Sequence, residues 1–360
     1  MAEKIHDPNM VKIFKETAET DWYEVTSDNF DIRGLLTDRE GSLSRRMPLD
    51  VAKTVSDGVY NQAIYGAGGR ILFSTDSPFV SIRAEYGAGY VPTVCNHIIS
   101  HGFDLYEFDG KQDKFIAAYR QVNDFDGKTA EFTGYTRKDG EMGYYTINMP
   151  HFCEVKKMYI GIKKGYRLGE SKKYINEKPV VYYGSSITHG AAAGRPGNTY
   201  ENFISQKYNL DYINLGFAGR AMGEQEMAEY IASIPMSVFV CDYDHNTPNE
   251  EHLRNTHFAF YETIRKKHPD VPYIMVTRPD AKINRDFRDK PDVRRDIIKE
   301  SYEKAKAMGD ENVYFIDGHT LFEGEFYESC TSDGCHPNDI GFMRMADKIG
   351  TVIAEVLNLK

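Results

Sequence analysis

Residues 180–190 carry the feature that most constrains the fold: a run of β-forming residues, Val-Val-Tyr-Tyr, leads directly into a Gly-Ser-Ser turn. A serine on a sharp strand-to-helix turn presents its hydroxyl at the carboxyl end of the strand, where open parallel sheets hold their reacting groups. The N-terminus of a following helix also favours negative charge. We therefore interpret Ser186 as a candidate nucleophile. Ser185 is the alternative, and a plain loop with a helix cap is the competing interpretation.

The chain beyond residue 178 alternates between short apolar runs and helical spacing. We expect strands at 180–183, 211–214, 238–241, 273–277 and 313–316. Apolar residues between and after them recur at helical intervals. These stripes are Met227, Tyr230, Ile231 and Ile234; Leu253, Phe260, Tyr261 and Ile264; Val293, Ile297 and Ile298; and Ile340, Met343, Ala346, Ile349 and Ile353. The alternation predicts an α/β fold with a parallel five-stranded sheet in flavodoxin-like order and helices on both faces.

The chain before residue 175 is mostly β in character. Short β-rich runs occupy 71–73, 80–84, 115–119, 144–147 and 155–162, and Lys-Asp-Gly at 138–140 is typical of a hairpin turn. The single predicted helix, near 49–62, is centred on Val51, Val55 and Val59. Such short strands without long helical periods predict a two-sheet, jelly-roll-like sandwich.

A polar segment at 163–178, rich in lysine and containing Gly165 and Gly169, is interpreted as a linker. A chain of 360 residues is long enough for two domains. We place a β-sandwich at 1–175 and an α/β domain at 176–360.

A second stretch near the other end, Thr-Ser-Asp-Gly-Cys-His-Pro at 331–337, supplies what a serine nucleophile needs. A serine hydroxyl is a weak nucleophile at neutral pH, so it requires a base, and the base requires a partner that orients it. His336 is the candidate base and Asp333 the candidate orienting carboxylate. If Asp333 instead caps a turn, another acceptor would orient His336.

Together these two stretches resemble the SGNH, or GDSL-type, hydrolases over roughly residues 178–360. In that family a serine follows the first strand and an Asp-x-x-His pair precedes the last helix. The resemblance implies an oxyanion hole built from the Ser186 backbone N–H, Gly219 after the second strand and Asn246 after the third. Gly216 and Asn249 are the alternatives, and Asn246 could instead cap the next helix.

Two departures from the family pattern stand out: Ser185 occupies the usual aspartate position, and the glycine expected two places before Asn246 is missing. In the N-terminal half, Gly-Phe-Asp-Leu-Tyr at 102–106 and Arg-Arg-Met-Pro at 45–48 resemble segments of a β-sandwich domain that precedes some SGNH esterases. In structural terms, we expect Asp104 in a turn and Leu105 in the core.

Charge and cysteine content limit the partners and the compartment. A net charge of −10 argues against a nucleic-acid partner, which would require a basic face. The first residues lack the apolar core of a signal peptide, and no run is long enough to span a bilayer, so no membrane partner is expected. Five widely spaced cysteines do not resemble a disulfide framework. We infer a cytoplasmic location.

The leading interpretation is a serine esterase that removes small acyl groups, most plausibly O-acetyl groups from carbohydrates, without a cofactor or metal. The carbohydrate rests on the family resemblance. Lipid or aryl esters are alternative substrates. Two other classes are kept: a metal-dependent hydrolase using Asp242, Asp244, His245 and His336, and a carbohydrate-binding protein with an inert second domain. His189, His245 and Arg278 are lesser candidates near the site.

Overall fold

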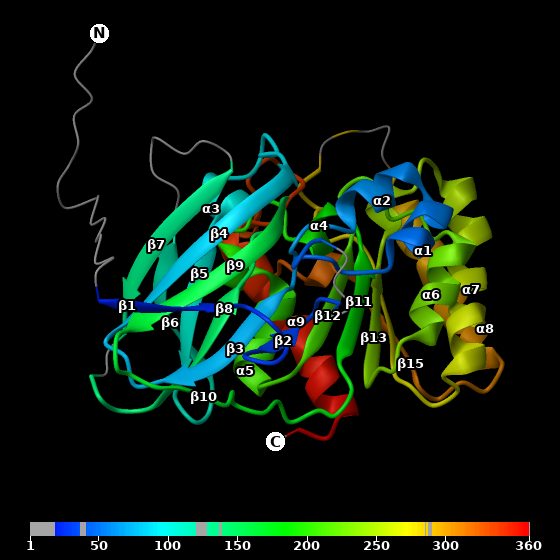
Figure 1. Cartoon of the computed structure of the whole chain (residues 1–360). Helices are drawn as coiled ribbons and strands as arrows, with labels where there is room; N and C mark the ends of the chain where they lie inside the picture. Colours follow the sequence, from blue (N-terminus) through cyan, green and yellow to red (C-terminus); the bar gives the residue numbers. More distant parts are fainter. Residues whose placement is uncertain are drawn as a thin grey trace, which may run out of the picture.

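The computed structural model describes residues 19–36, 41–119, 128–136, 139–284, 286 and 290–359. The first residues, on which the signal-peptide argument depends, lie outside this set. An antiparallel β region forms one side of the molecule and an α/β unit the other (Figure 1). The carboxyl edge of the α/β sheet holds every candidate residue of the C-terminal half.

The N-terminal half is a sandwich of two antiparallel sheets. One sheet has the order β1-β9-β4-β7; the other has the order β10-β3-β8-β5-β6, with β2 on β3. The strands are β1 (Thr20–Glu24), β2 (Asp31–Arg33), β3 (Arg70–Thr75), β4 (Phe79–Gly89), β5 (Phe103–Phe108), β6 (Asp113–Tyr119), β7 (Thr129–Tyr135), β8 (Gly143–Asn148), β9 (Cys153–Lys163) and β10 (Leu168–Gly169). Alternate residues of β4, such as Val80 and Ile82, enter the core that the two sheets enclose. The predicted sandwich is therefore confirmed.

Three local predictions in this half are corrected. The strands on either side of 138–140 belong to different sheets, so no hairpin joins them; Lys138 itself lies outside the described residues. Asp104 lies within β5 rather than in a turn, and it is fully buried, whereas Leu105 is a core residue as expected. The segment at 163–178 contributes the short strand β10 instead of being only a linker.

The predicted helix near 49–62 is two helices, α1 (Leu49–Val55) and α2 (Asp57–Gln62), because Ser56 takes an extended conformation and caps α2. Their buried residues Ala52, Val59 and Ala63 join the core of the α/β half. Helix α1 lies beside α6 (Gln225–Ser233) of that half (Figure 1). A segment early in the sequence thus packs against the second unit. The short helix α3 (His97–His101) likewise buries Ile99 in a core cluster of the α/β half.

The C-terminal half is a five-stranded parallel sheet in the order β12-β11-β13-β14-β15. Its strands are β11 (Val180–Gly184), β12 (Tyr212–Gly216), β13 (Val238–Asp242), β14 (Tyr273–Val276) and β15 (Val313–Ile316). All five match the predicted runs within a few residues. Counting β11 as the first strand gives the order 2-1-3-4-5, so the predicted flavodoxin-like order is confirmed.

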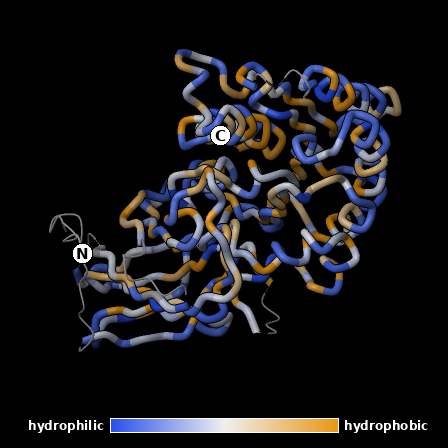
Figure 2. The backbone as a smooth tube through the Cα atoms, turned by 90° about the horizontal axis from the view of Figure 1, so that it is seen from above, coloured by the Kyte–Doolittle hydropathy of each residue, from blue (hydrophilic) through white to orange (hydrophobic). Residues whose placement is uncertain are grey.

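Helices cover both faces of this sheet. They are α4 (Ser186–His189), α5 (Tyr200–Tyr208), α6, α7 (Glu250–Lys267), α8 (Pro291–Ala307) and α9 (Asp339–Val356), with 3₁₀ turns η1 (Pro196–Asn198), η2 (Asp244–Asn246), η3 (Gly318–Thr320) and η4 (Tyr327–Cys330). In β11, Val181 and Tyr183 pack with α6 and α7, whereas Val180 and Tyr182 pack with α5 and α9. Figure 2 shows hydrophobic segments, in orange, interspersed with hydrophilic ones along the backbone. A strand buried on both faces explains the continuous apolar run at 180–183.

The apolar stripes are shifted at two helices. Val293, Ile340 and Met343 were predicted to be buried but are exposed. In α9 the buried face runs through Phe342 and Met345, and Ile340 and Met343 lie roughly 100° or more around the helix from Phe342. At the start of α9 the buried residues therefore differ from the predicted ones, while Ala346, Ile349 and Ile353 are buried as predicted.

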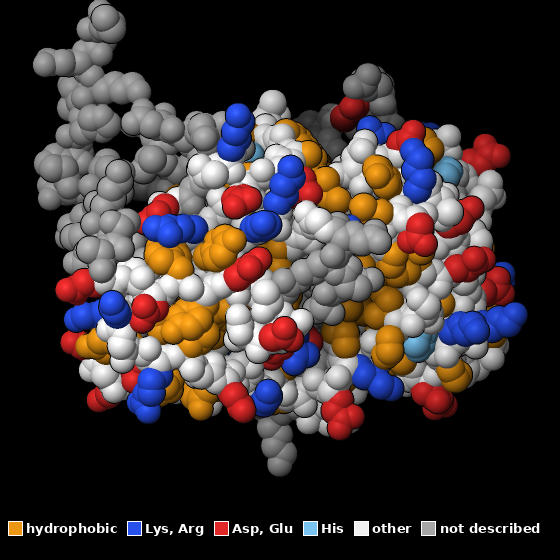
Figure 3. Space-filling model, viewed as in Figure 1, with side chains coloured by type: hydrophobic (Ala, Val, Ile, Leu, Met, Phe, Trp, Pro, Cys, Tyr) orange, Lys and Arg blue, Asp and Glu red, His pale blue; other side chains and the backbone are white. Residues whose placement is uncertain are grey.

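Surface and thiol features add three observations. No described helix has the length and apolar character that crossing a membrane requires. Acidic and basic side chains are interspersed over the face shown in Figure 3. All five cysteines are free thiols.

A buried carboxyl group in α5 couples folding to pH. Glu201 is fully buried, and its Oε1 accepts a 3.4 Å hydrogen bond from Asn214 Nδ2. Burial raises the pKa of Glu201 from 4.5 to about 8. The folded chain therefore holds a proton that the unfolded chain releases, and Glu201 makes stability fall as pH rises from about 4.5 to about 8.

We expect Glu201→Gln to remove this dependence, because glutamine keeps the shape and the acceptor oxygen but never ionises. The variant should have a thermal midpoint near that of the wild type at pH 5. Its advantage should grow toward pH 8, to on the order of a few kcal/mol. Thermal unfolding of both proteins from pH 5 to 9 checks this. A midpoint difference that stays constant over the range would contradict it.

Candidate active site

The turn after β11 separates the roles of its two serines. A Cβ on Gly184 would lie 2.3 Å from the Asp242 carbonyl oxygen, so only glycine fits at the end of the strand. Ser185 is 0% exposed, and its hydroxyl accepts a 3.2 Å bond from the Ile187 N–H as the N-cap of α4. Ser186, the first residue of the helix, is partly exposed. The exposed hydroxyl therefore belongs to Ser186.

Ser186, His336 and Asp333 form a continuous hydrogen-bonded chain although 150 residues separate the first two. Ser186 Oγ lies 3.0 Å from His336 Nε2, and His336 Nδ1 lies 2.8 Å from Asp333 Oδ2. An ionised carboxylate only accepts hydrogen bonds, so Nδ1 donates to Asp333. The remaining ring nitrogen, Nε2, then accepts from the Ser186 hydroxyl.

The loop that carries the histidine is held by its own carboxylate. Asp333 Oδ1 accepts from the backbone N–H groups of Cys335 at 3.0 Å and His336 at 2.7 Å. Partial burial acts to raise the pKa of Asp333, but the hydrogen bonds from the backbone and ring of His336 outweigh it and hold that pKa below its usual range. The same side chain thus forms the turn and contacts the ring, so no other acceptor is needed.

The loops after β12 and β13 lie on either side of the hydrogen-bonded series Ser186–His336–Asp333. Gly184 pairs in register with Gly216 on one side and with Asp242 on the other, so the three following loops start at the same level. Of the two glycine candidates, Gly216 donates its N–H to Asn214 Oδ1 at 2.8 Å and has no second donor to offer. Gly219 has a φ of +68°, and among the described residues its N–H meets no acceptor.

Asn246 lies at the end of η2, directly after β13. Its Nδ2 donates to the Phe217 carbonyl at 3.0 Å, which uses one of its two amide hydrogens and ties the two loops together. The N-cap of α7 is Asn249, which accepts from the His252 N–H at 2.8 Å. Asn249, rather than Asn246, is therefore the helix cap.

The lesser candidates have structural partners. His189 is fully buried, with Nε2 2.7 Å from the His151 carbonyl, and burial lowers its pKa well below the usual value. His245 Nε2 lies 2.9 Å from Asp280 Oδ1. The Arg278 guanidinium donates two hydrogen bonds to the same carboxylate, at 2.8 and 2.7 Å. Arg278 is a buried ion-pair residue.

In the described part of the chain, the four side chains of the metal-dependent hypothesis do not come together in one potential metal site. Asp242 and Asp244 are fully buried and lie in neither potential metal-binding group. Those groups are His245 with Asp280 and Cys335, and Asp333 with Cys335 and His336. The second group is the histidine loop itself.

Residues of the N-terminal half that the sequence did not single out as functional reach these loops. Arg46 donates to the carbonyls of Gly216 and Asn214, and Gln62 donates to the carbonyl of Ala218. These contacts span more than 150 residues, so local sequence patterns do not predict them. The Arg-Arg-Met-Pro segment was the one sequence feature that pointed to this region.

The Gly-Phe-Asp-Leu-Tyr segment also contacts the second half. Asp104 Oδ2 accepts from the Gly197 N–H at 2.7 Å, and Tyr106 OH lies 3.4 Å from Asn198 Oδ1. Both N-terminal motifs therefore contribute residues to the interface between the two halves of the chain.

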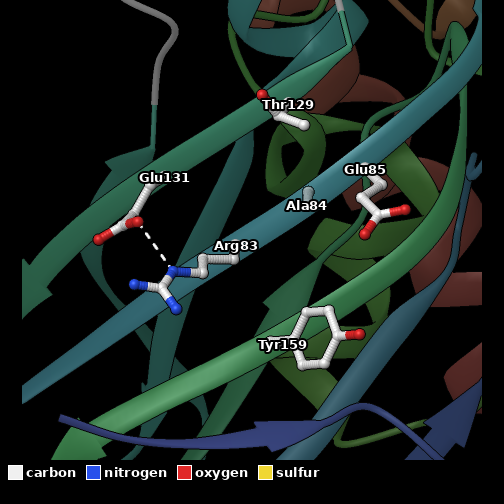
Figure 4. A pocket seen from close by; sticks show the side chains of 6 residues that line it. All are labelled: Arg83, Ala84, Glu85, Thr129, Glu131 and Tyr159. Atoms are coloured by element: carbon white, nitrogen blue, oxygen red, sulfur yellow. Dashed lines mark hydrogen bonds and ion pairs between the residues drawn. The ribbon is translucent and has the colours of Figure 1, made fainter. Parts of the chain in front are cut away.

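Two surface hollows in the described part of the chain lie away from this centre. A hollow of about 270 Å³ lies on the outer face of the β1-β9-β4-β7 sheet, where Arg83 pairs with Glu131 beside Tyr159 (Figure 4). Another, of about 440 Å³, is lined by Ser27 through Ile32 and by Glu170. Neither contains Ser186, so the site is located by its hydrogen-bonded side chains.

A hydroxyl, an imidazole and a carboxylate in series at the carboxyl edge of a parallel sheet define the class of α/β enzymes equipped for acyl transfer. Residues 177–354 match the family model for the GDSL-like lipase/acylhydrolase family, and residues 20–168 match the N-terminal domain model, named GxDLY, of SGNH-hydrolase-type esterases. The chain belongs to the GDSL/SGNH lipase-acylhydrolase family, with an N-terminal GxDLY domain, and is an ester hydrolase.

Solved structures share the fold of this chain. A protein of Bacteroides ovatus described as a GDSL-like lipase is 27% identical, with a TM-score of 0.84 over 94% of this chain and 99% of its own. The salicylyl-acyltransferase SsfX3 of a tetracycline biosynthetic pathway is 21% identical, with a TM-score of 0.75 over 95% and 99%. An acetyl xylan esterase of the rumen bacterium Butyrivibrio proteoclasticus is 13% identical, with a TM-score of 0.58 over 95% and 100%. No curated protein matches the chain.

Proposed function

We propose that the protein is a serine esterase that removes small acyl groups, most plausibly O-acetyl groups, from carbohydrates. The observation that carries the proposal is the hydrogen-bonded series Ser186–His336–Asp333. A base within 3.0 Å of the hydroxyl and a carboxylate within 2.8 Å of the base satisfy the geometric requirement for nucleophilic catalysis by serine.

In this mechanism Ser186 Oγ attacks the ester carbonyl carbon while His336 Nε2 takes the hydroxyl proton. Asp333 holds the ring in the tautomer that accepts at Nε2 and stabilises the imidazolium that forms. The oxyanion of the tetrahedral intermediate accepts hydrogen bonds from the N–H groups of Ser186 and Gly219 and from the second amide hydrogen of Asn246. His336 then protonates the departing alcohol, which leaves an acyl group on Ser186. A water molecule attacks this acyl group while His336 takes its proton, and His336 then returns a proton to Ser186 as the acid is released.

The carbohydrate substrate is supported by fold likeness to the acetyl xylan esterase and by the paired sandwich and hydrolase domains. Fold likeness to a salicylyl-acyltransferase keeps aryl acyl groups as an alternative. We also propose a cytoplasmic location, where imported oligosaccharides would be the substrates. Five free cysteines are compatible with a reducing compartment, and fractionation of cells that make the protein tests this.

The test is a screen of acetylated xylo- and cello-oligosaccharides, read by the loss of acetyl mass, beside p-nitrophenyl acetate, butyrate and salicylate esters. Deacetylation of an oligosaccharide by the wild type, but not by Ser186→Ala, supports the proposal. Hydrolysis of the aryl esters alone, with every acetylated sugar left intact, would overturn the carbohydrate assignment while leaving the esterase chemistry in place.

A separate prediction concerns Asn246. Asn246→Ala should mainly reduce kcat, because a side-chain donor matters most once charge develops on the substrate oxygen. One lost donor typically costs about 2.7–4 kcal/mol, roughly 10²- to 10³-fold in rate. Asn246→Asp should be at least as damaging, since it places a negative charge beside the oxyanion and the Phe217 carbonyl.

The matched control is Asn249, the true cap of α7. Asn249→Ala should cost about 1 kcal/mol of stability, and Asn249→Asp almost none, with near-normal turnover in both. Steady-state kinetics and thermal midpoints of the four variants make the comparison. Near-normal kcat in Asn246→Asp would sink the oxyanion role.

A further inference from the structure

The loop after β12, residues 216–220, is held from outside by several donors; we call it the β12 loop. Arg46 Nη1 donates to the Gly216 carbonyl at 2.8 Å, and Gln62 Nε2 donates to the Ala218 carbonyl at 2.9 Å. The Phe217 carbonyl between them accepts from Asn246. Three successive carbonyls before Gly219 are therefore fixed, two of them by the N-terminal half.

Arg46 is built into this position. Its backbone N–H donates to the Ala63 carbonyl at 2.8 Å, its Nη1 also reaches the Asn214 carbonyl at 3.1 Å, and its Nη2 donates to the Gln62 carbonyl at 2.9 Å. The guanidinium lies 4.8 Å from the centre of the Phe217 ring. One rigid fork therefore joins the end of α2, the end of β12 and the first side chain of the β12 loop.

Arg46 is buried, with 2% of the residue exposed, and among the described residues no carboxylate pairs with its guanidinium. Its charge is met by carbonyl oxygens and an aromatic face alone. A buried cation without a counter-ion costs folding free energy, and burial lowers the pKa of Arg46 to about 9. Such a costly group at the edge of a reactive centre points to a role beyond packing.

We propose that Arg46, assisted by Gln62, is a positioning residue of the oxyanion hole: the N-terminal domain holds the β12 loop so that the Gly219 N–H and the Asn246 amide face the developing oxyanion. This inference rests on the proposed function. It assigns to the N-terminal half of the chain an indirect part in the chemistry, through α2 and the segment before α1.

The physical reason is preorganisation. A loop whose carbonyls are fixed does not rearrange when charge develops on the substrate oxygen, so its N–H groups act at full strength in the transition state. Without Arg46 and Gln62, the Gly216 and Ala218 carbonyls would hydrogen-bond to water instead, and the loop would shift. A misplacement of about 1 Å at such a site costs up to roughly 10²-fold in rate.

The chain offers a matched control in Arg70, a second buried arginine of the N-terminal half that also reaches β12. Arg70 Nη2 donates to the Tyr212 carbonyl at 2.8 Å and to Asp211 Oδ1 at 2.6 Å, at the amino end of the strand. The two arginines contact opposite ends of the same strand, and only Arg46 contacts the reactive edge.

The experiment compares Arg46→Met, Arg46→Lys, Gln62→Met and Arg70→Met in the full chain, below the thermal midpoint of each. We expect a loss of kcat of roughly 10- to 10²-fold in Arg46→Met with little change in KM, and a smaller loss in Gln62→Met. Lysine, which keeps the charge but not the fork, should recover part of the loss. Arg70→Met should lose stability but keep kcat.

Inhibition by phenylboronic acid, whose serine adduct is tetrahedral and anionic, supplies the readout that a purely structural role would not move. The inhibition constant should weaken in parallel with kcat in the Arg46 and Gln62 variants and stay unchanged in Arg70→Met. If Arg46→Met does not fold, Gln62→Met decides, because it leaves the arginine fork in place.

Two failures are distinguishable. If Ser186→Ala retains activity, the proposed function itself is wrong. If Ser186→Ala is inactive while the Arg46 and Gln62 variants match Arg70→Met in kcat and in boronate inhibition, only the positioning role is overturned.

Discussion

Replacing Ser186 with alanine is expected to lower kcat for ester hydrolysis by roughly 10⁶-fold, the loss typical of a removed serine nucleophile. The hydroxyl of Ser186 is the one that contacts His336 Nε2, at 3.0 Å. Its neighbour cannot substitute for it, because the Ser185 hydroxyl is buried and engaged as the cap of α4. KM should change little, since alanine removes no group that the bound ester needs.

Ser185→Ala is the matched control for this prediction. It should cost about 1 kcal/mol of stability through the lost cap, with a far smaller effect on turnover. A serine-directed phosphonate should label Ser186 in both the wild type and Ser185→Ala, and should leave Ser186→Ala unlabelled. Peptide mapping that places the label on Ser185, or turnover by Ser186→Ala close to that of the wild type, would show that the nucleophile is misassigned.

Much of the α/β half could be predicted because its signals are local. The strand at 180–183 is buried on both faces, so its apolar run is continuous, and a glycine at its end is dictated by the approach of the Asp242 carbonyl. Asp333 and His336 lie three residues apart on one turn, so their pairing follows from spacing. The role of Ser185 required the helix geometry, because either serine could have capped α4.

What the sequence did not reveal depends on contacts between distant segments. Nothing local to residues 49–62 indicates that α1 packs against α6 or that α2 joins the same core, because their apolar spacing suits either half. The strands on either side of residue 140 resemble a hairpin, yet they join different sheets. The bond from Arg46 to Gly216 spans 170 residues, and an arginine before a helix carries no mark of such a partner.

His336 should be as indispensable as the serine, and the two losses should not add. His336→Ala is expected to lower kcat by roughly 10⁶-fold, and the double variant with Ser186→Ala should be no worse than either single variant. The reason is that the hydroxyl and the ring act as one unit: without the base the serine keeps its proton, and without the serine the base has no proton to take. Asp333→Asn should cost less, roughly 10⁴-fold, since it disturbs the tautomer and orientation of a ring that is still present.

A histidine outside the site provides the control for this cycle. His319 also lies beside a carboxylate, with Nδ1 2.9 Å from Asp317 Oδ1, but its second nitrogen faces Asp292 instead of a hydroxyl. His319→Ala should therefore leave kcat near the wild-type value. Single-turnover rates for the wild type, the three single-site variants, the double variant and His319→Ala test the whole scheme. Losses that multiply in the double variant would mean that Ser186 and His336 act independently, and the hydrogen-bonded series could then not be the catalytic unit.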